Sequence, residues 1–210
     1  MSAEKRTERT SASADDGTTV TRMSREDRRR SIIAAATEQF ARGGYAGTTT
    51  DEVAQAAGVS QPYVVRMFGG KSKLFRAVVT EAFERTVGVF EQKLDELGQT
   101  PEITADTPEY WESLGGAYKE LVADRAQLLV LMHGFAAGAE PEIGALARAG
   151  MASIYRLLVD RTHCTPDQAR DFLAHGMLIN VLLAIEAPAH VAGDDALAEL
   201  TGCTIETPGE

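Results

Sequence analysis

Residues 48–75 read as two short helices joined by a tight turn, and this stretch constrains the fold more than any other. Thr49 is a favourable N-cap residue, and Glu52, three residues later, completes the pattern of a capping box. Gly58 is placed to end the first helix, because glycine adopts the left-handed conformation of a helix C-terminus at little cost. The pattern therefore predicts a helix that begins after Thr49 and ends at Gly58.

The second helix of the pair is expected to run from Ser60, its predicted cap, to the glycines at 69–70. Pro62 stands in its first turn, where a missing N–H costs little. At 100° per residue, Val64 and Phe68 share one face, which should pack inward against the first helix. The opposite face of this short helix should point away from the first helix and is available for a function other than packing.

That outer face carries an aromatic residue and a cation. Tyr63 and Arg66 should point outward, and Gln61 supplies an amide near the helix N-terminus. A short helix with these groups on its exposed face suits the major groove of DNA. The alternative is an ordinary helical hairpin whose outer face, which also includes Pro62 and Val65, is only solvated.

Residues around this helix pair extend the pattern in both directions. They are Ile32, Ile33, Ala36, Phe40, Gly44, Tyr45, Thr49, Thr50, Val53, Ala54, Ala57, Gly58, Val59, Phe68, Gly69, Gly70, Lys71 and Leu74. With this pattern, residues 25–76 resemble the DNA-binding domain of the TetR (tetracycline-repressor) family of bacterial transcription regulators. One position departs from the family: Val65 stands where an aromatic residue commonly touches a phosphate, and Tyr63 is the candidate to take over some of that contact.

The predicted DNA contacts fall into two groups. Gln61, Tyr63 and Arg66 are candidates for base edges or nearby atoms, and residues at the starts of helices are candidates for phosphates. The complete set of predicted DNA-binding residues is Thr49, Thr50, Gln61, Pro62, Tyr63, Arg66 and Lys71.

Charge is distributed unevenly along the chain, whose formal net charge is −10. Residues 1–76 contain 13 Lys and Arg against 9 Asp and Glu, a net of +4, and the remainder contains 8 against 22, a net of −14. A basic face on an acidic body would orient the protein on a duplex, because phosphates attract one end and repel the other. The alternative is an acidic surface that serves solubility.

Length and composition exclude several classes of protein. With 210 residues and 44% hydrophobic content, the chain can hold one small domain and one of medium size. Its two cysteines show no pairing pattern, it has no hydrophobic signal core, and no apolar run reaches about 18 residues, so we expect a cytoplasmic protein that does not enter a membrane. No phosphate-binding loop, nucleophile elbow or metal-ligand spacing is present, so we expect no catalytic residue, metal or cofactor.

The chain before and after the helix pair is predicted as follows. Residues 1–23 are rich in Ser, Thr and Ala and read as a disordered arm. Ser24 and Asp27 form a capping box for the first helix, which should end at residues 43–44. Residues 71–97 form one long helix, which we interpret as the element that transmits a shift from the second domain to the first; a passive linker is the alternative.

Helical patterns continue to the end of the chain. After a loop they occupy 109–123, 125–137, 141–162, 166–187 and 195–200, followed by a tail at 204–210. The prediction is an all-α fold, in which a three-helix domain with a helix-turn-helix at 24–76 is joined by a long helix to a helical ligand-binding and dimerisation domain at 77–203.

The two long helices at 141–162 and 166–187 carry apolar surface that suits pairing with a second copy. These residues are Gly150, Met151, Ile154, Leu157, Leu158, Phe172, Leu173, Met177, Asn180, Val181 and Ala184. Two copies would then form a four-helix bundle, as TetR-family proteins do, and two-fold symmetry would favour a palindromic operator. The alternative is that these faces complete the core of the monomer.

Aromatic residues, methionines and a few polar groups in the second domain are candidates to line an apolar ligand cavity. They are Trp111, Tyr118, Met132, His133, Phe135, Met151, Tyr155, Phe172, His175, Met177 and Asn180. His133 and His175 lie inside apolar runs and are the candidates to orient a ligand. For each residue taken singly, the alternative is an ordinary place in the core.

These observations lead to one main hypothesis and two alternatives. We expect a homodimeric, ligand-responsive transcription regulator, a repressor released from a palindromic double-stranded operator by a small, largely apolar effector. The first alternative is a small-molecule binding or interaction protein that keeps the fold without specific DNA recognition, which the unusual Val65 suggests. The second is an enzyme whose chemistry depends on His175.

Overall fold

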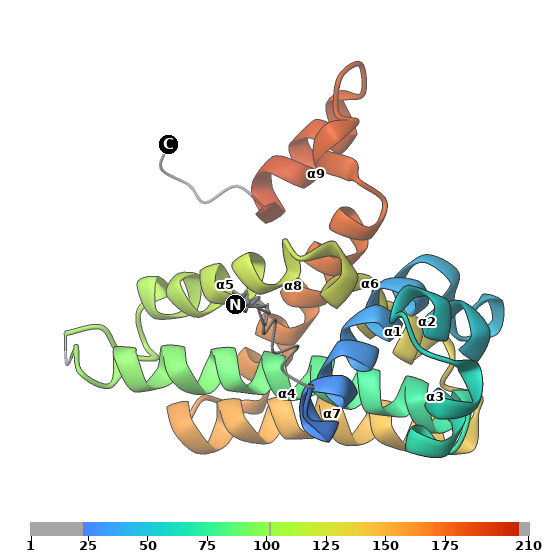
Figure 1. Cartoon of the computed structure of the whole chain (residues 1–210). Coiled ribbons are helices and arrows are strands. Elements are labelled where there is room, and N and C mark those ends of the chain that lie inside the picture. The colour runs from blue at the N-terminus through green and yellow to red at the C-terminus, as the bar shows by residue number, and fades with distance from the viewer. Residues whose placement is uncertain (1–22, 101, 206–210) are drawn as a thin grey trace, which may run out of the picture.

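The computed structural model describes residues 23–100 and 102–205, and all regular structure in them is helical (Figure 1). The elements are α1 (Arg25–Gly47), α2 (Thr50–Ala56), α3 (Gln61–Phe68), α4 (Lys71–Leu97), α5 (Pro108–Val122), α6 (Arg125–Ala136), α7 (Pro141–Thr162), α8 (Pro166–Ala184), the 3-10 turn η1 (Ala187–Ala189) and α9 (Asp195–Ile205). The predicted all-α architecture is confirmed. The expected arm lies, apart from Met23, outside the described residues, and so does most of the expected tail.

Local signals set the starts of the first helices. The capping boxes predicted at Ser24 and Thr49 are both present. In α1 the backbone of Gly44 has a φ of 62°, so regular helix breaks at the predicted position, although helical turns continue to Gly47. Gly58 has a φ of 64° in the turn between α2 and α3, which is the left-handed conformation expected of it.

A small core holds α1, α2 and α3 against the beginning of α4. Phe75 of α4 is fully buried, and its ring centre lies 4.8 Å from that of Phe40 and 5.2 Å from that of Tyr45. Val53 from α2 and Val64 from α3 are also fully buried in this cluster. Helices α1, α2 and α3 and the beginning of α4 therefore form one packed unit, which we call the head.

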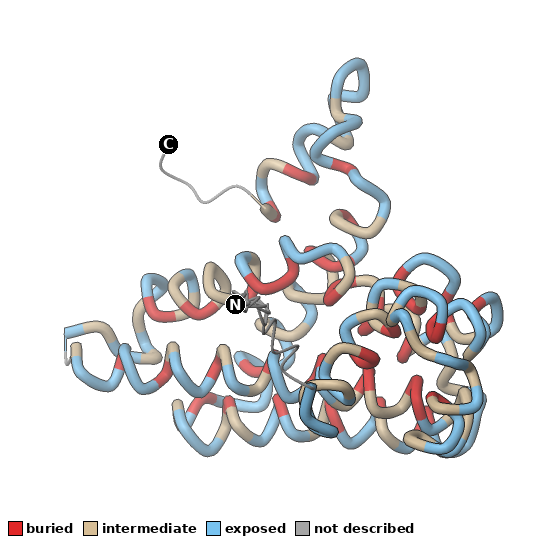
Figure 2. Tube along the Cα trace, in the orientation of Figure 1, coloured by how far each residue is buried: buried red, intermediate tan, exposed pale blue. Residues whose placement is uncertain are grey.

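The long helix α4 leaves the head and continues beside α7 (Figure 1). Buried positions recur along its length while other sides of the helix stay exposed (Figure 2). The hydrophobic core is continuous along this helix, from Leu74 in the head to Leu97 near its far end. The predicted long connecting helix is confirmed.

A second connection joins the head to the remaining helices, and it was not predicted. Helix α6 packs against α1, where Nε2 of His133 lies 3.2 Å from the main-chain oxygen of Ala41. The next residue, Gly134, faces α4 so closely that an added Cβ would lie 3.0 Å from a methyl group of Val79. Helix α6 is thus wedged between α1 and α4.

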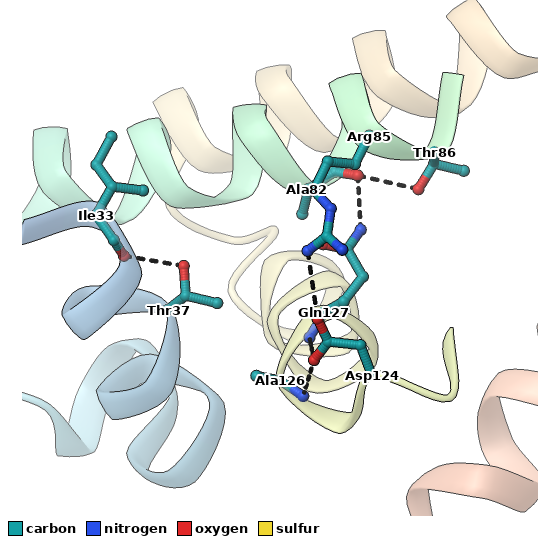
Figure 3. A network of polar contacts seen from close by, with 8 residues as sticks. All are labelled: Ile33, Thr37, Ala82, Arg85, Thr86, Asp124, Ala126 and Gln127. Atoms are coloured by element: carbon teal, nitrogen blue, oxygen red, sulfur yellow. Dashed lines mark hydrogen bonds and ion pairs between the residues drawn. The ribbon is translucent and has the colours of Figure 1, made fainter. Parts of the chain in front are cut away.

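A polar network fastens α6 to α4 (Figure 3). The side-chain amide of Gln127, which is buried, donates to the main-chain oxygen of Ala82 at 2.8 Å. The guanidinium of Arg85 donates to Gln127 Oε1 at 3.2 Å and to Asp124 Oδ2 at 3.3 Å. Because Asp124 also caps the start of α6, this network fixes that end of the helix on the middle of α4.

Two glycines in long helices give opposite predictions for the same substitution. Gly88 of α4 is exposed and an added Cβ would meet nothing within 4 Å, so Gly88→Ala should raise the free energy of unfolding by about 0.5–1 kcal/mol through helix propensity. In Gly150→Ala the new Cβ would lie 2.5 Å from the buried ring of Phe83, so this variant should be less stable than the wild type. Urea unfolding of the two variants tests both signs, and equal shifts would contradict the packing at Gly150.

The end of the chain differs from the prediction in two ways. Helix α8 ends at Ala184 and not near Ala187, because Glu186 adopts a left-handed φ of 57° and a 3-10 turn follows. Helix α9 extends five residues beyond the predicted 195–200, to Ile205. Thr204 is buried in it, so the predicted tail is helical at its start.

Most of the apolar face predicted for dimerisation on α7 is used within the chain. Gly150, Ile154 and Leu158 are buried against the chain's own helices, Gly150 in contact with Phe83. For these residues the prediction of a partner surface is wrong, because the facing apolar groups come from α4, which sequence spacing did not place there. On α8, by contrast, Val181 keeps 42% of its surface exposed.

Candidate DNA-binding surface and effector cavity

Helix α3 presents its predicted outer face to solvent. Val64 is fully buried and Phe68 is half-buried, whereas Pro62, Val65 and Arg66 are exposed. Tyr63 is half-buried and packs at the edge of the core. The exposed strip is short, with the apolar Pro62 and Val65 followed by the charged Arg66.

The predicted DNA-binding residues of α3 make two contacts, one with α2 and one within α3. Gln61 Nε2 donates to Thr50 Oγ1 at 3.2 Å, which links the start of α3 to the start of α2. The guanidinium carbon of Arg66 lies 5.4 Å from the ring centre of Tyr63, within the range of a cation–π contact. Two of the predicted base-reading residues are therefore oriented by each other before any DNA is present.

The predicted cap of α3 is only partly present. Ser60 occupies the N-cap position, but its side chain accepts no capping hydrogen bond. The amides of Tyr63 and Val64 donate to the main-chain oxygen of Ser60 at 3.0 and 3.3 Å instead. The Ser60 hydroxyl is thus not used to hold the helix.

The residues predicted to hold phosphates lie at the starts of α2 and α4. Thr49 is exposed and Thr50 half-buried, and the hydroxyl of Thr49 is part of the capping box with Glu52. Lys71 Nζ donates to the main-chain oxygen of Ala46 at 3.1 Å and lies 5.0 Å from the ring centre of Tyr45. The ammonium group of Lys71 therefore lies beside the last turn of α1, just before α2.

The capping box of α2 predicts a pH-dependent contribution to stability. The backbone N–H of Thr49, followed by its hydroxyl, holds the pKa of the Glu52 carboxyl below its ordinary value. A lowered folded-state pKa stabilises the fold above the unfolded pKa of about 4.3, and this contribution disappears as the pH falls through the folded value. The stability difference between wild type and Glu52→Ala should therefore be present at pH 6 to 7 and shrink below about pH 4. Urea unfolding across this range measures it, and a difference independent of pH would contradict the capping role.

Three consecutive arginines near the start of α1 have different surroundings. Arg30 pairs with Asp27, and the guanidinium carbon of Arg29 lies 5.5 Å from the ring centre of Phe68. Arg28 forms no ion pair with a described residue. Instead it lines a surface hollow of about 490 Å³ beside the turn between α2 and α3. The sequence alone does not distinguish these adjacent arginines, because their partners come from different turns and helices.

A small cavity lies among the helices beyond the head. Its volume is about 40 Å³, and it is lined by Phe83, Thr86, Phe90, Tyr118, Leu131, Phe135, Met151, Ile154, Phe172, Leu173, Gly176, Met177 and Asn180. The main polar feature is the hydroxyl of Tyr118, which donates to Asn180 Oδ1 at 2.9 Å. Burial raises the pKa of Tyr118, so the phenol stays protonated near neutral pH.

The predicted ligand-binding residues are divided among several places. Six of them line the cavity, namely Tyr118, Phe135, Met151, Phe172, Met177 and Asn180. Trp111 and His175 line a separate groove of about 460 Å³ on the outside, where His175 is exposed. His133 contacts α1, Met132 is half-buried outside the cavity, and Tyr155 is exposed.

The cavity also contains residues that sequence analysis did not select. Phe83, Thr86 and Phe90 all come from α4, the helix that enters the head. Phe83 and Phe90 recur at helical spacing within residues 71–97, but such spacing indicates a buried helix face and not a cavity. No described helix is long and apolar enough to cross a membrane. Within the described residues, no group of three His, Cys, Asp or Glu is placed to hold a metal ion.

Residues 32–78 match the model of the tetR family of bacterial regulatory proteins. The N-terminal domain of this chain belongs to the TetR family. The HTH-type transcriptional activator FasR of Mycolicibacterium smegmatis is 36% identical to it over 73 residues, which are 35% of this chain and 33% of FasR. The match thus spans only about a third of the length of that relative.

Solved structures resemble this chain over most of its length. A tetR-family transcriptional regulator from Streptomyces coelicolor has a TM-score of 0.58 and 19% identity, covering 87% of this chain and 90% of its own. The multidrug binding protein EbrR, solved in complex with imidazole, has a TM-score of 0.58 and 20% identity, covering 87% and 97%. At these identities the likeness establishes the fold, a helix-turn-helix head followed by a helical domain.

Proposed function

We propose that this chain is a homodimeric transcription regulator in which α3 reads the major groove of an operator. The observation that carries the proposal is the outer face of α3, where Gln61 and Arg66 are exposed or half-buried and held by Thr50 and Tyr63. Buried Val64 fixes the opposite face of the helix to the head. Membership of the head in the TetR family supports this function.

Phosphate contacts are proposed for the head as well. Thr49, Thr50 and Lys71 lie at helix starts, and Arg28 lies beside the start of α3 with no acidic partner among the described residues. The uncommitted hydroxyl of Ser60 borders the same hollow. Charge-assisted contacts of this kind position a protein on DNA without reading its sequence.

Arg28 and Arg30 provide a matched test of these phosphate contacts. Arg28→Ala should weaken binding to operator and to random DNA alike, and should reduce the slope of log K against log salt concentration by about 1. Arg30→Ala removes the same charge from a residue already paired with Asp27, so its effect should be clearly smaller. Binding measured by fluorescence anisotropy at several salt concentrations provides the slopes, and equal slopes for both variants would contradict the assignment.

An effector is proposed to act through α6 and α4. Leu131 and Phe135 of α6 line the cavity, while His133 of the same helix contacts α1 in the head. A molecule that enlarges the cavity would therefore displace α6 against the head. Coupling of this kind is limited by the difference in the effector's affinity for the two conformations.

We propose release of a repressor as the sense of regulation. EbrR, whose fold is similar, is described as a multidrug binding protein, which supports a small-molecule effector. FasR is named an activator, so the opposite sense is the competing proposal. A reporter gene placed behind an operator selected from randomised DNA distinguishes the two senses. Deletion of the regulator raises expression of the reporter for a repressor and lowers it for an activator.

A homodimer is proposed through the exposed side of α8. Val181 and Ile185 are one turn apart and expose 42% and 61% of their surface. Apolar side chains at this spacing are typical of helix pairing, and a two-fold axis would place two copies of α3 on one side of a duplex. Analytical ultracentrifugation measures the mass of the species in solution.

The experiment that tests the function is selection from randomised duplex DNA followed by sequencing. Enrichment of a palindrome is the expected result, and its half-site spacing gives the distance between the two recognition helices. Retention without a motif, falling steeply with salt, would overturn sequence-specific regulation. That outcome would favour a small-molecule binding protein that keeps the fold, which the apolar, 37% exposed Val65 on α3 motivates.

A further inference from the structure

Two hollows lie on either side of α8, and neither is a complete site for a small molecule. The inner cavity of about 40 Å³ has room for only a few water molecules, since each needs about 10–15 Å³ of such space. Typical ligand pockets have about 300–1,000 Å³. The outer groove between α5, α8 and α9 has about 460 Å³, but it is open to solvent and its walls mix polar and apolar groups.

The side chain of Phe172 is the wall that the two hollows share. It lines both of them. Its ring centre lies 5.7 Å from that of Phe90, which belongs to the inner cavity, and 5.4 Å from that of Trp111, which belongs to the outer groove. A rotation of this one side chain would join the apolar interior to the groove.

One side of the Phe172 ring has room for a methyl group. Opposite its ring stands Gly115 of α5, where even an added Cβ would lie 4.0 Å from Phe172. The side chain is half-buried, and no hydrogen bond holds it. Met151 and Met177 line the inner cavity, and their flexible side chains can adopt other conformations when the shape of the cavity changes.

The groove contains one lysine, Lys119, beside the carboxylates of Asp171 and Glu112. Lys119 is half-buried, its ammonium group donates to the main-chain oxygen of Ile205 at 2.9 Å, and it forms no ion pair with a described residue. Asp171 is exposed and paired with Arg170, and Glu112 is exposed. The acidic body repels anions over long distances, but at physiological salt this repulsion is screened beyond about 8 Å.

We propose that the cavity and the groove are the two halves of one ligand site, closed by Phe172, for a molecule with an apolar, ring-containing end and a carboxylate. The apolar end enters between the rings of α4 and α8, and the carboxylate pairs with Lys119. This site rests on the effector role proposed above and assigns that effector a chemical class.

A matched pair of probes tests the site without DNA. The anion 4-phenylbutyrate and the cation 4-phenylbutylammonium share their apolar part and differ in the charge of the head. Trp111 is the only tryptophan of the chain and contacts Phe172, so its fluorescence reports movement of the gate directly. The anion should change this fluorescence and bind at least about tenfold more tightly than the cation by isothermal titration calorimetry. Equal affinities would overturn the assignment of an anion.

Variants separate the two halves of the site. Lys119→Gln should weaken the anion about tenfold and leave the cation unchanged, whereas Glu112→Gln, on the same helix, should not weaken the anion. Phe172→Ala should tighten binding and shift the Trp111 emission without ligand, and Met151→Phe, which fills the inner cavity, should weaken binding. Circular dichroism establishes that each variant is folded, and a wild-type affinity in both Phe172→Ala and Met151→Phe would overturn the two-part site.

Operator binding in the presence of 4-phenylbutyrate separates this inference from the proposed function. Anion binding that leaves the DNA affinity unchanged would support the site and contradict the effector role. Sequence-specific DNA binding by a protein that binds neither probe would support the regulator and overturn the site.

Discussion

Phe75→Ala is expected to lower the free energy of unfolding by about 3–5 kcal/mol. Phe75 is fully buried at the centre of the head, and its ring packs edge-on against Phe40 and at a tilt against Tyr45. Truncation removes the apolar area of the ring and leaves a cavity that α1 and α4 cannot close without moving. Urea unfolding followed by circular dichroism measures the change.

Two further variants interpret that result. Phe75→Leu keeps most of the apolar volume and should lose clearly less stability than Phe75→Ala. Val65→Ala shortens an exposed side chain of the same head and should stay within about 0.5 kcal/mol of the wild type. A loss below about 1 kcal/mol for Phe75→Ala would show that the packing around this ring is not the source of the head's stability.

Arg66→Ala is expected to weaken binding to the selected operator by about 1–3 kcal/mol, because a bidentate contact to a base edge contributes that much to discrimination. Arg66 is exposed on α3, and its guanidinium is held over the ring of Tyr63. Loss of this side chain leaves the fold of the head unchanged, since it is not part of the core. The measurement is a comparison of dissociation constants for operator and random duplexes.

Arg156→Ala is the control, because it removes the same charge from an exposed position on α7, away from the head. Its operator affinity should match that of the wild type. If Arg66→Ala weakens operator and random DNA equally, Arg66 contacts a phosphate and base reading falls to Gln61 and Tyr63. An unchanged operator affinity in Arg66→Ala would remove Arg66 from the interface altogether.

Features that depend on neighbouring residues were predictable from the sequence. The capping boxes at Ser24 and Thr49 and the left-handed turn at Gly58 lie where they were expected. Each of them is decided by contacts within about four residues, so a single sequence contains all the groups involved. The inward face of α3, with Val64 buried, follows from helical periodicity in the same way.

Features that depend on partners far along the chain were not predictable. His133 and His175 lie in similar apolar runs, yet one contacts Ala41 of α1 and the other is exposed beside a groove. Gly150 was assigned to a partner surface, although Phe83 of α4 covers it. Apolar residues at helical spacing indicate that a face of a helix is buried, but they do not indicate which helix packs against it.

The sequence by itself determined the helices to within a few residues, the capping boxes at Ser24 and Thr49 and the helix-turn-helix head, because these depend on local hydrogen bonds and on a period of 3.6 residues. Only the tertiary structure decided that α6 lies wedged between α1 and α4, that Gln127 is buried on Ala82, and that Phe172 separates a cavity from a groove. The physical reason is that side-chain packing pairs surfaces by shape and volume, and residues distant in the sequence meet only when the whole core is assembled.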